Sequence, residues 1–462
     1  MEGLEEKLAQ YVSNSRFEDL SPAAIDSAKR STLDTLGAML AGSRAGGMET
    51  LIDLARGSGS APEAHIIGRP LKLSALAAAW CNGAMARALE IDDCVDFLPV
   101  HPSASAVPAL LALAEMKKGM SGRDFLTALA VGQDIIIRMG LAVRENAMES
   151  GRNNLFKIFG PAAAIARAMG LDSYQTHQAM GISFSFAVGD GQCALDGAAQ
   201  TLSLQQGIVA QGALYSGLLA EQGFLGAREF LTGRFGYLVA FEPNPKLEHL
   251  TEGLGKEFHG ERITIKPFSS CRATHPSIDL ALRLIEAHEL KPASITKITV
   301  RTTPEIHNLV AVPHQSKCRP ESVSDAQFSI QFTLGAALIR GDMFLKELEP
   351  VCLGDPSILD VAKRVEVVPD ESLRTDSVLG KTLMEIETLD LGIIECEVEA
   401  PLGSPKRAMT REACAEKLMK CAEYTHHSPP RELLEELIER SDRLEEMNDV
   451  SELFHYLTNG TE

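Results

Sequence analysis

Helical periodicity built on small residues constrains this chain more than any other feature of its sequence. From the N-terminus to about residue 240, apolar residues recur at helical spacing in stretches rich in alanine and glycine. Small side chains let helix axes approach closely, and aromatic residues make up only 5% of the chain. The sequence therefore predicts a compact helical bundle, with helices over residues 21–42, 72–91, 104–117, 122–143, 160–170 and 198–221.

The pattern changes near residue 260, where apolar and polar residues alternate and β-branched residues become common, as is typical of strands. Helical periodicity returns after about residue 405. We therefore predict a mainly α fold with a discontinuous all-helical domain over residues 1–255 and 405–462, and a smaller α/β (α+β) lid domain over residues 256–404. The segments "ERITIKPF", "ITKITVRTT" and "IIECEVEA" are the expected strands, and 275–289, 326–340 and 356–363 the helices between them.

Composition excludes several classes of function. A net charge of -19 argues against non-specific nucleic-acid binding, which needs clustered Lys and Arg. The nine cysteines are scattered without a CxxC pair or zinc-like spacing, which indicates reduced thiols. The start "MEGLEEKLAQYV" is acidic where a signal peptide is basic, and no apolar run reaches the roughly 18 to 20 residues that span a bilayer. We expect a cytoplasmic protein with no nucleic-acid or membrane partner.

The triplet His-Pro-Ser occurs twice, each time before an expected helix, with His101 in the first copy and His275 in the second. A histidine beside a helix N-terminus is disfavoured as imidazolium, so we expect a neutral ring at pH 7. Four acids, Glu90, Asp92, Asp93 and Asp96, are expected at the C-terminal end of the helix that precedes His101. They are either solvated, paired with Arg87, or used to orient His101 by accepting its ring N–H.

The second copy lies just after an expected strand that ends at Pro267, with Lys266 at the strand's end. Cys271 and Arg272 follow in a short polar loop, at a strand-to-helix turn of the kind that often carries function. The alternatives are a solvent-facing Lys266 and a buried, inert Cys271. Cys271 and His275 lack an obvious third metal ligand, so no metal site is expected.

Five segments, taken together, are similar to the MmgE/PrpD family. They are "LDTLGAMLAG", "NGAMARALEIDD…HPSASAVPALLALAE", "SGRDFLTALAVGQDI", "GPAAAIARAMGLD" and "KPFSSCRATHPSIDLAL", and they cover nearly the whole chain in order. The resemblance implies a large helical domain with a smaller α/β lid, a homodimer, and no metal or organic cofactor. The family includes 2-methylcitrate dehydratase, cis-aconitate decarboxylase and iminodisuccinate epimerase.

The resemblance also implies site residues. His101 matches the histidine of the family's HPS segment, and Lys266 and His275 match its K-P-x-x-x-C-x-x-x-H segment. Two segments differ from those of dehydratase- and decarboxylase-like members. A further histidine is replaced by Gly151 or Asn153, and a K-x-L-H segment has Leu202 and Gln205 at its lysine and histidine positions.

Proton removal beside a carboxylate without a cofactor needs a base, donors for the developing charge, and an acid. We expect His101, oriented by a nearby carboxylate, to be the base, and Lys266 and His275 to supply charge stabilisation and the acid. Arginine suits carboxylates because its fork binds them at two points. The expected catalytic residues are His101, Asp93, Lys266 and His275, and the expected substrate-binding residues are Arg87, Glu90, Asp92, Arg138, Asn153, Cys271 and Arg272.

The expected activity is that of a lyase, 2-methylcitrate dehydratase-like, acting on a small di- or tricarboxylate. An epimerase of an iminodisuccinate-like acid is the nearest alternative, because proton removal and return alone would suit the altered positions. A cis-aconitate-type decarboxylase is the third. A scaffold that binds a carboxylate without turnover is the non-enzymatic alternative, favoured if His101, Lys266 and His275 do not converge.

Overall fold

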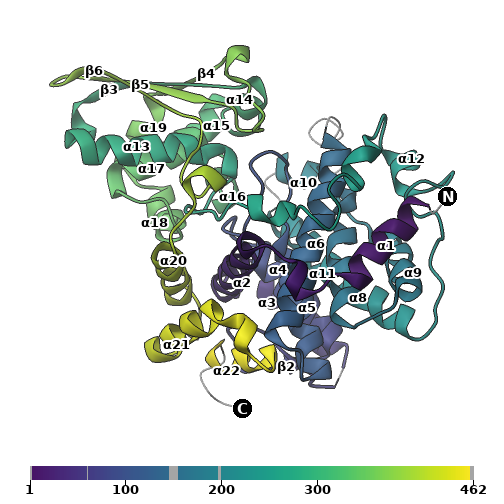
Figure 1. The fold of residues 1–462 in the computed structure, drawn as a ribbon. Helices are drawn as coiled ribbons and strands as arrows, with labels where there is room; N and C mark the ends of the chain where they lie inside the picture. Colours follow the sequence, from purple (N-terminus) through teal and green to yellow (C-terminus); the bar gives the residue numbers. More distant parts are fainter. Residues whose placement is uncertain (1–2, 60, 145–153, 196–198, 458–462) are drawn as a thin grey trace.

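The computed structural model describes residues 3–59, 61–144, 154–195 and 199–457, and these form two adjoining bodies (Figure 1). The larger body is helical, and the smaller one combines a four-stranded sheet with helices. The helices of the larger body include six that match the expected ones: α2 (Pro22–Gly42), α4 (Ala75–Arg87), α5 (Ser103–Lys117), α6 (Gly122–Ala142), α8 (Phe159–Ala168) and α11 (Ala199–Glu221). It also contains α1 (Leu4–Asn14), α3 (Met48–Gly57), α9 (Ser173–Ser183), α10 (Gln192–Leu195), α12 (Tyr237–Phe241), α20 (Arg411–Glu423), α21 (Arg431–Asp442) and α22 (Leu453–Leu457).

Local signals explain where several of these helices begin. The Ser21 side chain accepts a hydrogen bond from the Ala24 N–H at 3.0 Å, directly before the proline that starts α2. Ser74 caps α4 in the same way, at 3.3 Å from the Ala77 N–H. A serine oxygen in this place satisfies a backbone donor that the helix itself leaves open.

Glycine lets α4 and α11 pack with their backbones in contact. A Cβ atom added at Gly207 of α11 would lie 2.3 Å from the Trp80 carbonyl oxygen of α4. No L-residue with a side chain fits there without moving one helix. The small residues of the sequence therefore set the spacing of the bundle.

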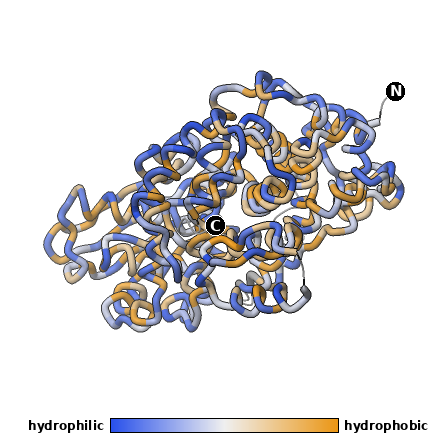
Figure 2. The backbone as a smooth tube through the Cα atoms, turned by 90° about the horizontal axis from the view of Figure 1, so that it is seen from below, coloured by the Kyte–Doolittle hydropathy of each residue, from blue (hydrophilic) through white to orange (hydrophobic). Residues whose placement is uncertain are grey.

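One apolar core unites residues from α2 to α11 with the C-terminal helices. Leu36, Leu418, Leu437 and Phe454 all belong to it and are almost fully buried. Within the described ranges, α6 alone has the length and apolar composition of a membrane span, yet 94% of that window is buried inside the fold. Figure 2 shows hydrophobic residues gathered in the inner helices of this body.

The smaller body has its own core around a sheet of strand order β4-β3-β5-β6. The central strand β3 runs parallel to β4 and antiparallel to β5, with Ile298 of β3 opposite both Val365 and Ile386. Helices α13, α17 and α19 lie together along one face of this sheet (Figure 1). The strands are β3 (Ile295–Thr302), β4 (Val365–Pro369), β5 (Thr382–Thr388) and β6 (Gly392–Val398); a separate hairpin pairs β1 (Ala64–His65) with β2 (Lys72–Leu73). The helices are α13 (His275–His288), α14 (Pro304–Val310), α15 (His314–Cys318), α16 (Val323–Gln327), α17 (Ile330–Arg340), α18 (Pro350–Leu353) and α19 (Pro356–Lys363).

Two local predictions were wrong. Residues 261–268 were expected to form a strand, but only Thr264 pairs with another backbone, through a single antiparallel bridge to Cys94. The reason is that Ile263 and Ile265 pack into the core of the helical body, away from the sheet. The helix expected over 72–91 ends at Arg87, and Glu90 follows with a left-handed φ of 56°. The four acids after it therefore lie in a loop and not in the helix's last turn.

Candidate active site

A cavity of about 440 Å³ lies where the two bodies meet. Its wall includes the loop between α4 and α5 (residues 88–102, here the acidic loop), a short 3-10 helix η2 (Leu155–Ile158), and the turn before α13. The α/β body adds an apolar side made of Ile306, Leu309, Phe328, Val378 and Leu379. The described wall carries the charged or titratable residues Arg87, Glu90, Cys94, Asp96, His101, Lys157, Asp190, Lys266, Cys271 and Arg272.

The acidic loop is held at two points. Cys94 and Thr264 exchange backbone hydrogen bonds of 3.0 and 2.8 Å. The Asp93 carboxylate accepts the Ser103 N–H at 3.1 Å and the Ser103 hydroxyl at 2.5 Å, at the first residue of α5. Asp93 is fully buried, and burial together with the Asp34 carboxylate raises its pKa to about 7. Asp93 thus anchors the loop to α5, while its side chain does not line the cavity.

His101 lies on the cavity wall two residues before α5 begins. Its Nδ1 is 3.0 Å from the Asp93 carbonyl oxygen and 2.9 Å from Asp92 Oδ2. Because both neighbours are acceptors, we assign the proton to Nδ1, which donates to the carbonyl while the carboxylate contributes its charge. Nε2 has no hydrogen bond to any described residue, and 20% of the side chain is exposed. The basic nitrogen is therefore the one available to a ligand.

Charges around His101 favour a neutral ring beside an ionised carboxylate. Burial and then the Arg87 guanidinium lower the pKa of His101, and together they outweigh the opposing effect of Asp92. Although burial raises the pKa of Asp92, His101 and Arg87 hold it below its usual range. A neutral imidazole with a carboxylate behind its Nδ1 is the arrangement of a general base.

Glu90 is shared by two cations. Arg87 approaches one carboxylate oxygen at 2.5 Å, and Lys266 Nζ lies 2.9 Å from the other and 3.1 Å from the Glu90 carbonyl oxygen. These cations hold the pKa of Glu90 at about 2 despite its burial. Lys266 is only 1% exposed, which excludes the solvent-facing alternative. Glu90 and Asp92 raise the pKa of Lys266 against the effect of burial, so the lysine stays charged.

The histidine of the second His-Pro-Ser segment is buried and does not line the cavity. His275 is the first residue of α13 and is fully buried. Its Nε2 donates to the Ser270 carbonyl oxygen at 3.2 Å, and Nδ1 accepts from Arg272 at 3.1 Å. Arg272 also binds both Asp96 oxygens, at 2.8 and 3.0 Å, and lines the cavity. The acid role expected for His275 stays a prediction, since one ring nitrogen binds Arg272 and the other binds the Ser270 carbonyl oxygen.

The structure places the remaining expected residues as follows. Cys271 lines the cavity, and burial raises the pKa of its thiol to about 11, so it is not a thiolate at neutral pH. Arg138 does not reach the cavity, because it pairs with Asp134 at 2.7 Å inside α6 and donates to backbone carbonyls of residues 249–257. The carboxylate-binding role expected for Arg138 is therefore wrong. Gly151 and Asn153 lie outside the described residues.

Residues that sequence reasoning missed also reach the wall. Lys157 in η2 is 5% exposed and donates to Gln205 Oε1 at 3.2 Å. Its signal in the sequence is a lone lysine inside the apolar run "LFKIF". Asp190 and Gln206 line the same cavity, as does Leu202. In the described part of the chain, no group of three or more His, Cys, Asp or Glu side chains is placed to hold a metal ion.

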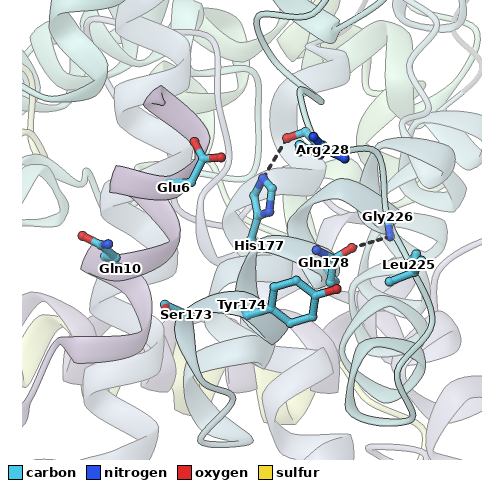
Figure 3. A pocket seen from close by; sticks show the side chains of 9 residues that line it. All are labelled: Glu6, Gln10, Ser173, Tyr174, His177, Gln178, Leu225, Gly226 and Arg228. Carbon is cyan, nitrogen blue, oxygen red and sulfur yellow. Dashed lines mark hydrogen bonds between the residues drawn. The ribbon is translucent and has the colours of Figure 1, made fainter. Parts of the chain in front are cut away.

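A second hollow, of about 670 Å³, lies between α1, α9 and residues 225–228 (Figure 3). Its histidine, His177, donates from Nε2 to the Arg228 carbonyl oxygen at 2.7 Å, and Gln178 accepts from the Gly226 N–H at 2.9 Å. None of the expected site residues that the structure describes lies there. The converging charged groups point to the cavity between the two bodies as the candidate active site.

Two family models match successive parts of this chain. The MmgE/PrpD N-terminal domain matches residues 6–250, and the MmgE/PrpD C-terminal domain matches residues 268–443. A cis-aconitate decarboxylase of Aspergillus terreus is 26% identical over 98% of this chain and 96% of its own length. The cis-aconitate decarboxylase-like protein oryM of Aspergillus oryzae is 27% identical over 97% and 95%, and the human cis-aconitate decarboxylase is 25% identical over 82% and 79%.

Proposed function

Because this chain belongs to the MmgE/PrpD family, we propose that it is a lyase of small polycarboxylates and that it decarboxylates a cis-aconitate-like tricarboxylate. Relatives named as cis-aconitate decarboxylases align with nearly its whole length. They favour decarboxylation over the dehydration expected from sequence. The dehydratase and epimerase reactions become alternative outcomes of the same experiment.

The observation that carries the proposal is the unpartnered Nε2 of His101 in a cavity with several cations. Asp92 and the Asp93 carbonyl oxygen hold the ring through Nδ1, so Nε2 can exchange a proton with a ligand. Lys266 and Arg272 reach the same wall. A small anion in this cavity therefore meets a proton carrier and fixed positive charge together.

The chemistry needs these two elements and balances without a cofactor. The bond between the methylene carbon and its carboxylate breaks, and the bonding pair forms a new double bond. The electrons of the original double bond take up one proton at the neighbouring carbon, and one carbon dioxide leaves. In the intermediate, negative charge spreads onto a remaining carboxylate, where Lys266 and Arg272 stabilise it. His101 carries the proton on Nε2, with Asp92 balancing the imidazolium charge.

The test is turnover in D2O, followed by NMR together with release of carbon dioxide. The substrates are cis-aconitate, citrate, 2-methylcitrate, malate and iminodisuccinate, each with wild type and His101→Ala. Carbon dioxide from cis-aconitate with one deuteron in the product supports the proposal. Water loss from a hydroxy acid points to a dehydratase, and deuterium exchange without net conversion points to an epimerase. No reaction with any of the five compounds overturns the lyase proposal.

The pH profile separates the same reactions independently. If His101 delivers a proton, the rate falls as pH rises through its lowered pKa. If His101 removes a proton, as dehydration and epimerisation require, the rate rises over that range. A profile of the second kind, found together with decarboxylation, would contradict the role of His101 as the proton donor.

A further inference from the structure

We propose that Lys157 binds a carboxylate of the substrate in this cavity and takes up a proton as it does so. The inference rests on the proposed function, since it takes a polycarboxylate to be the occupant of the cavity. It concerns a residue that lies outside every motif of the sequence, and it follows from how the cavity wall is built.

The fold buries Lys157 and yet keeps the residue on the cavity wall. Asn154 precedes η2 with a left-handed φ of 50°, and Phe156 and Ile158 on either side of the lysine are buried in the helical core. Lys157 itself is 5% exposed and lines the cavity. Its Nζ makes a hydrogen bond of 3.2 Å to Gln205 Oε1. Among the described residues it forms no ion pair.

Each of the other cations of the described wall is paired with a carboxylate of the protein. Arg87 lies 2.5 Å from Glu90 and 3.4 Å from Asp92. Lys266 pairs with Glu90 at 2.9 Å, and the Arg272 fork binds Asp96. Lys157 differs because a neutral amide is its partner. A buried ammonium without a counter-ion is costly, and a ligand carboxylate is the group that would remove this cost.

The surroundings of Lys157 make its charge depend on the ligand. Burial and then Arg87 of α4 lower the pKa of Lys157 to about 7, with a small opposing effect of Cys193 of α10. Asp190 lies on the same wall, and Gln205 of α11 is uncharged. About half of the molecules therefore carry the lysine's proton at pH 7. A carboxylate placed against Nζ favours the charged form, so binding draws in a proton from solvent.

The test measures binding and proton uptake without turnover. Tricarballylate, a saturated tricarboxylate that has no double bond to shift, is titrated into the protein by calorimetry at pH 7. Two buffers of different ionisation enthalpy are used. We expect wild type to take up about half a proton per ligand. Lys157→Met is expected to weaken binding at least tenfold and to abolish the uptake. Lys157→Arg, which stays charged, should keep binding within a few-fold but also lose the uptake.

Controls keep the result specific to Lys157. Lys29 is another largely buried lysine, paired with Glu445 and absent from the cavity wall, and Lys29→Met should leave both quantities unchanged. Circular dichroism checks that each variant is folded, and Lys157→Arg carries the test if Lys157→Met is not. Uptake that persists at the wild-type level in the Lys157 variants overturns the inference.

The experiments distinguish failure of the role proposed for Lys157 from failure of the proposed function. Turnover of cis-aconitate with unchanged binding in Lys157→Met would leave the function standing and overturn the role of Lys157. If tricarballylate binding took up a proton that depends on Lys157, but no substrate were turned over, the role of Lys157 would stand and the proposed function would be overturned. Failure of wild type to bind tricarballylate would overturn the role of Lys157, whatever turnover shows.

Discussion

The two His-Pro-Ser segments approach their helices with the same three residues and place their histidines in different settings. In the first, Pro102 is the cap position and α5 begins at Ser103, so His101 stays outside the helix. In the second, α13 begins at His275 itself. His101 keeps Nε2 for a ligand, whereas both nitrogens of His275 hold neighbouring groups.

The difference arises from partners elsewhere in the chain. The Asp93 carboxylate binds the N–H and hydroxyl of Ser103, so the first helix has a side-chain cap supplied by the acidic loop. No side chain of the described residues caps the second helix, and Arg272, which is paired with Asp96, binds His275. The shared triplet thus marks the start of a helix, while the role of each histidine depends on what surrounds it.

The largest expected effect tests the first histidine. His101→Ala should lower kcat by about 10²- to 10⁴-fold, because the group that carries the proton is lost. Its free energy of unfolding should change little, since the ring is partly exposed and packs at a cavity. Product formation by NMR and urea unfolding measure the two quantities. His177→Asn, in the separate hollow of Figure 3, is the matched control. If His101→Ala were as active as wild type, the catalytic role that distinguishes His101 from His275 would be contradicted.

The next largest effect concerns the ion pair that joins the two segments. Asp96→Asn should lower the free energy of unfolding by about 2 to 3 kcal/mol, because it leaves the largely buried Arg272 guanidinium without its carboxylate. This value lies below that of a fully buried pair because both side chains are slightly exposed. Urea unfolding is the measurement. Asp53→Asn breaks an exposed pair with Arg56 and should cost less than about 0.5 kcal/mol. Equal losses in the two variants would contradict the prediction.

A smaller effect is expected at the second histidine. His275→Ala leaves an Arg272 N–H and the Ser270 carbonyl oxygen without their partner, which should destabilise the protein by about 1 to 3 kcal/mol. Activity per folded molecule should fall less than in His101→Ala, because His275 acts through Arg272. Unfolding and steady-state kinetics on the same preparations decide this. If kcat fell as far as in His101→Ala with no loss of stability, His275 would be the acid first expected from the sequence.

The last prediction concerns how the stability that the first segment contributes depends on pH. The pKa of Asp93 is about 7 in the folded protein against an ordinary value of 3.8. The folded state then holds a proton that the unfolded chain has lost, so this stabilisation is complete below pH 3.8 and disappears as pH rises through 7. Its slope is at most about 1.4 kcal/mol per pH unit. Asp93→Asn should flatten the decline between pH 5 and 8 in urea unfolding. An unchanged decline would show that other groups cause it.

Much of the fold could be predicted because its signals are local. The start of α2 at Pro22 and its end at Gly42 matched the prediction, since a capping serine and the spacing of apolar residues act within a few positions. Sequence also grouped the acids with His101. The sequence could not show which of these acids contacts His101, because the path of the acidic loop depends on the bridge between Cys94 and Thr264. That bridge brings Lys266 to Glu90 and leaves Asp92 for His101.

The sequence by itself determined the helical body, the sheet strands at 295–302 and 392–398, and the set of residues from which the site is built. Only the tertiary structure decided which of them reach the cavity and in which charge state. Residues 261–268 alternate like a strand but are drawn into the helical core. Lys157 lies in no motif, yet burial beside Arg87 changes its pKa by more than any neighbour in sequence does. Periodicity reports contacts along one element, whereas desolvation and ion pairing depend on groups that meet only when the chain has folded.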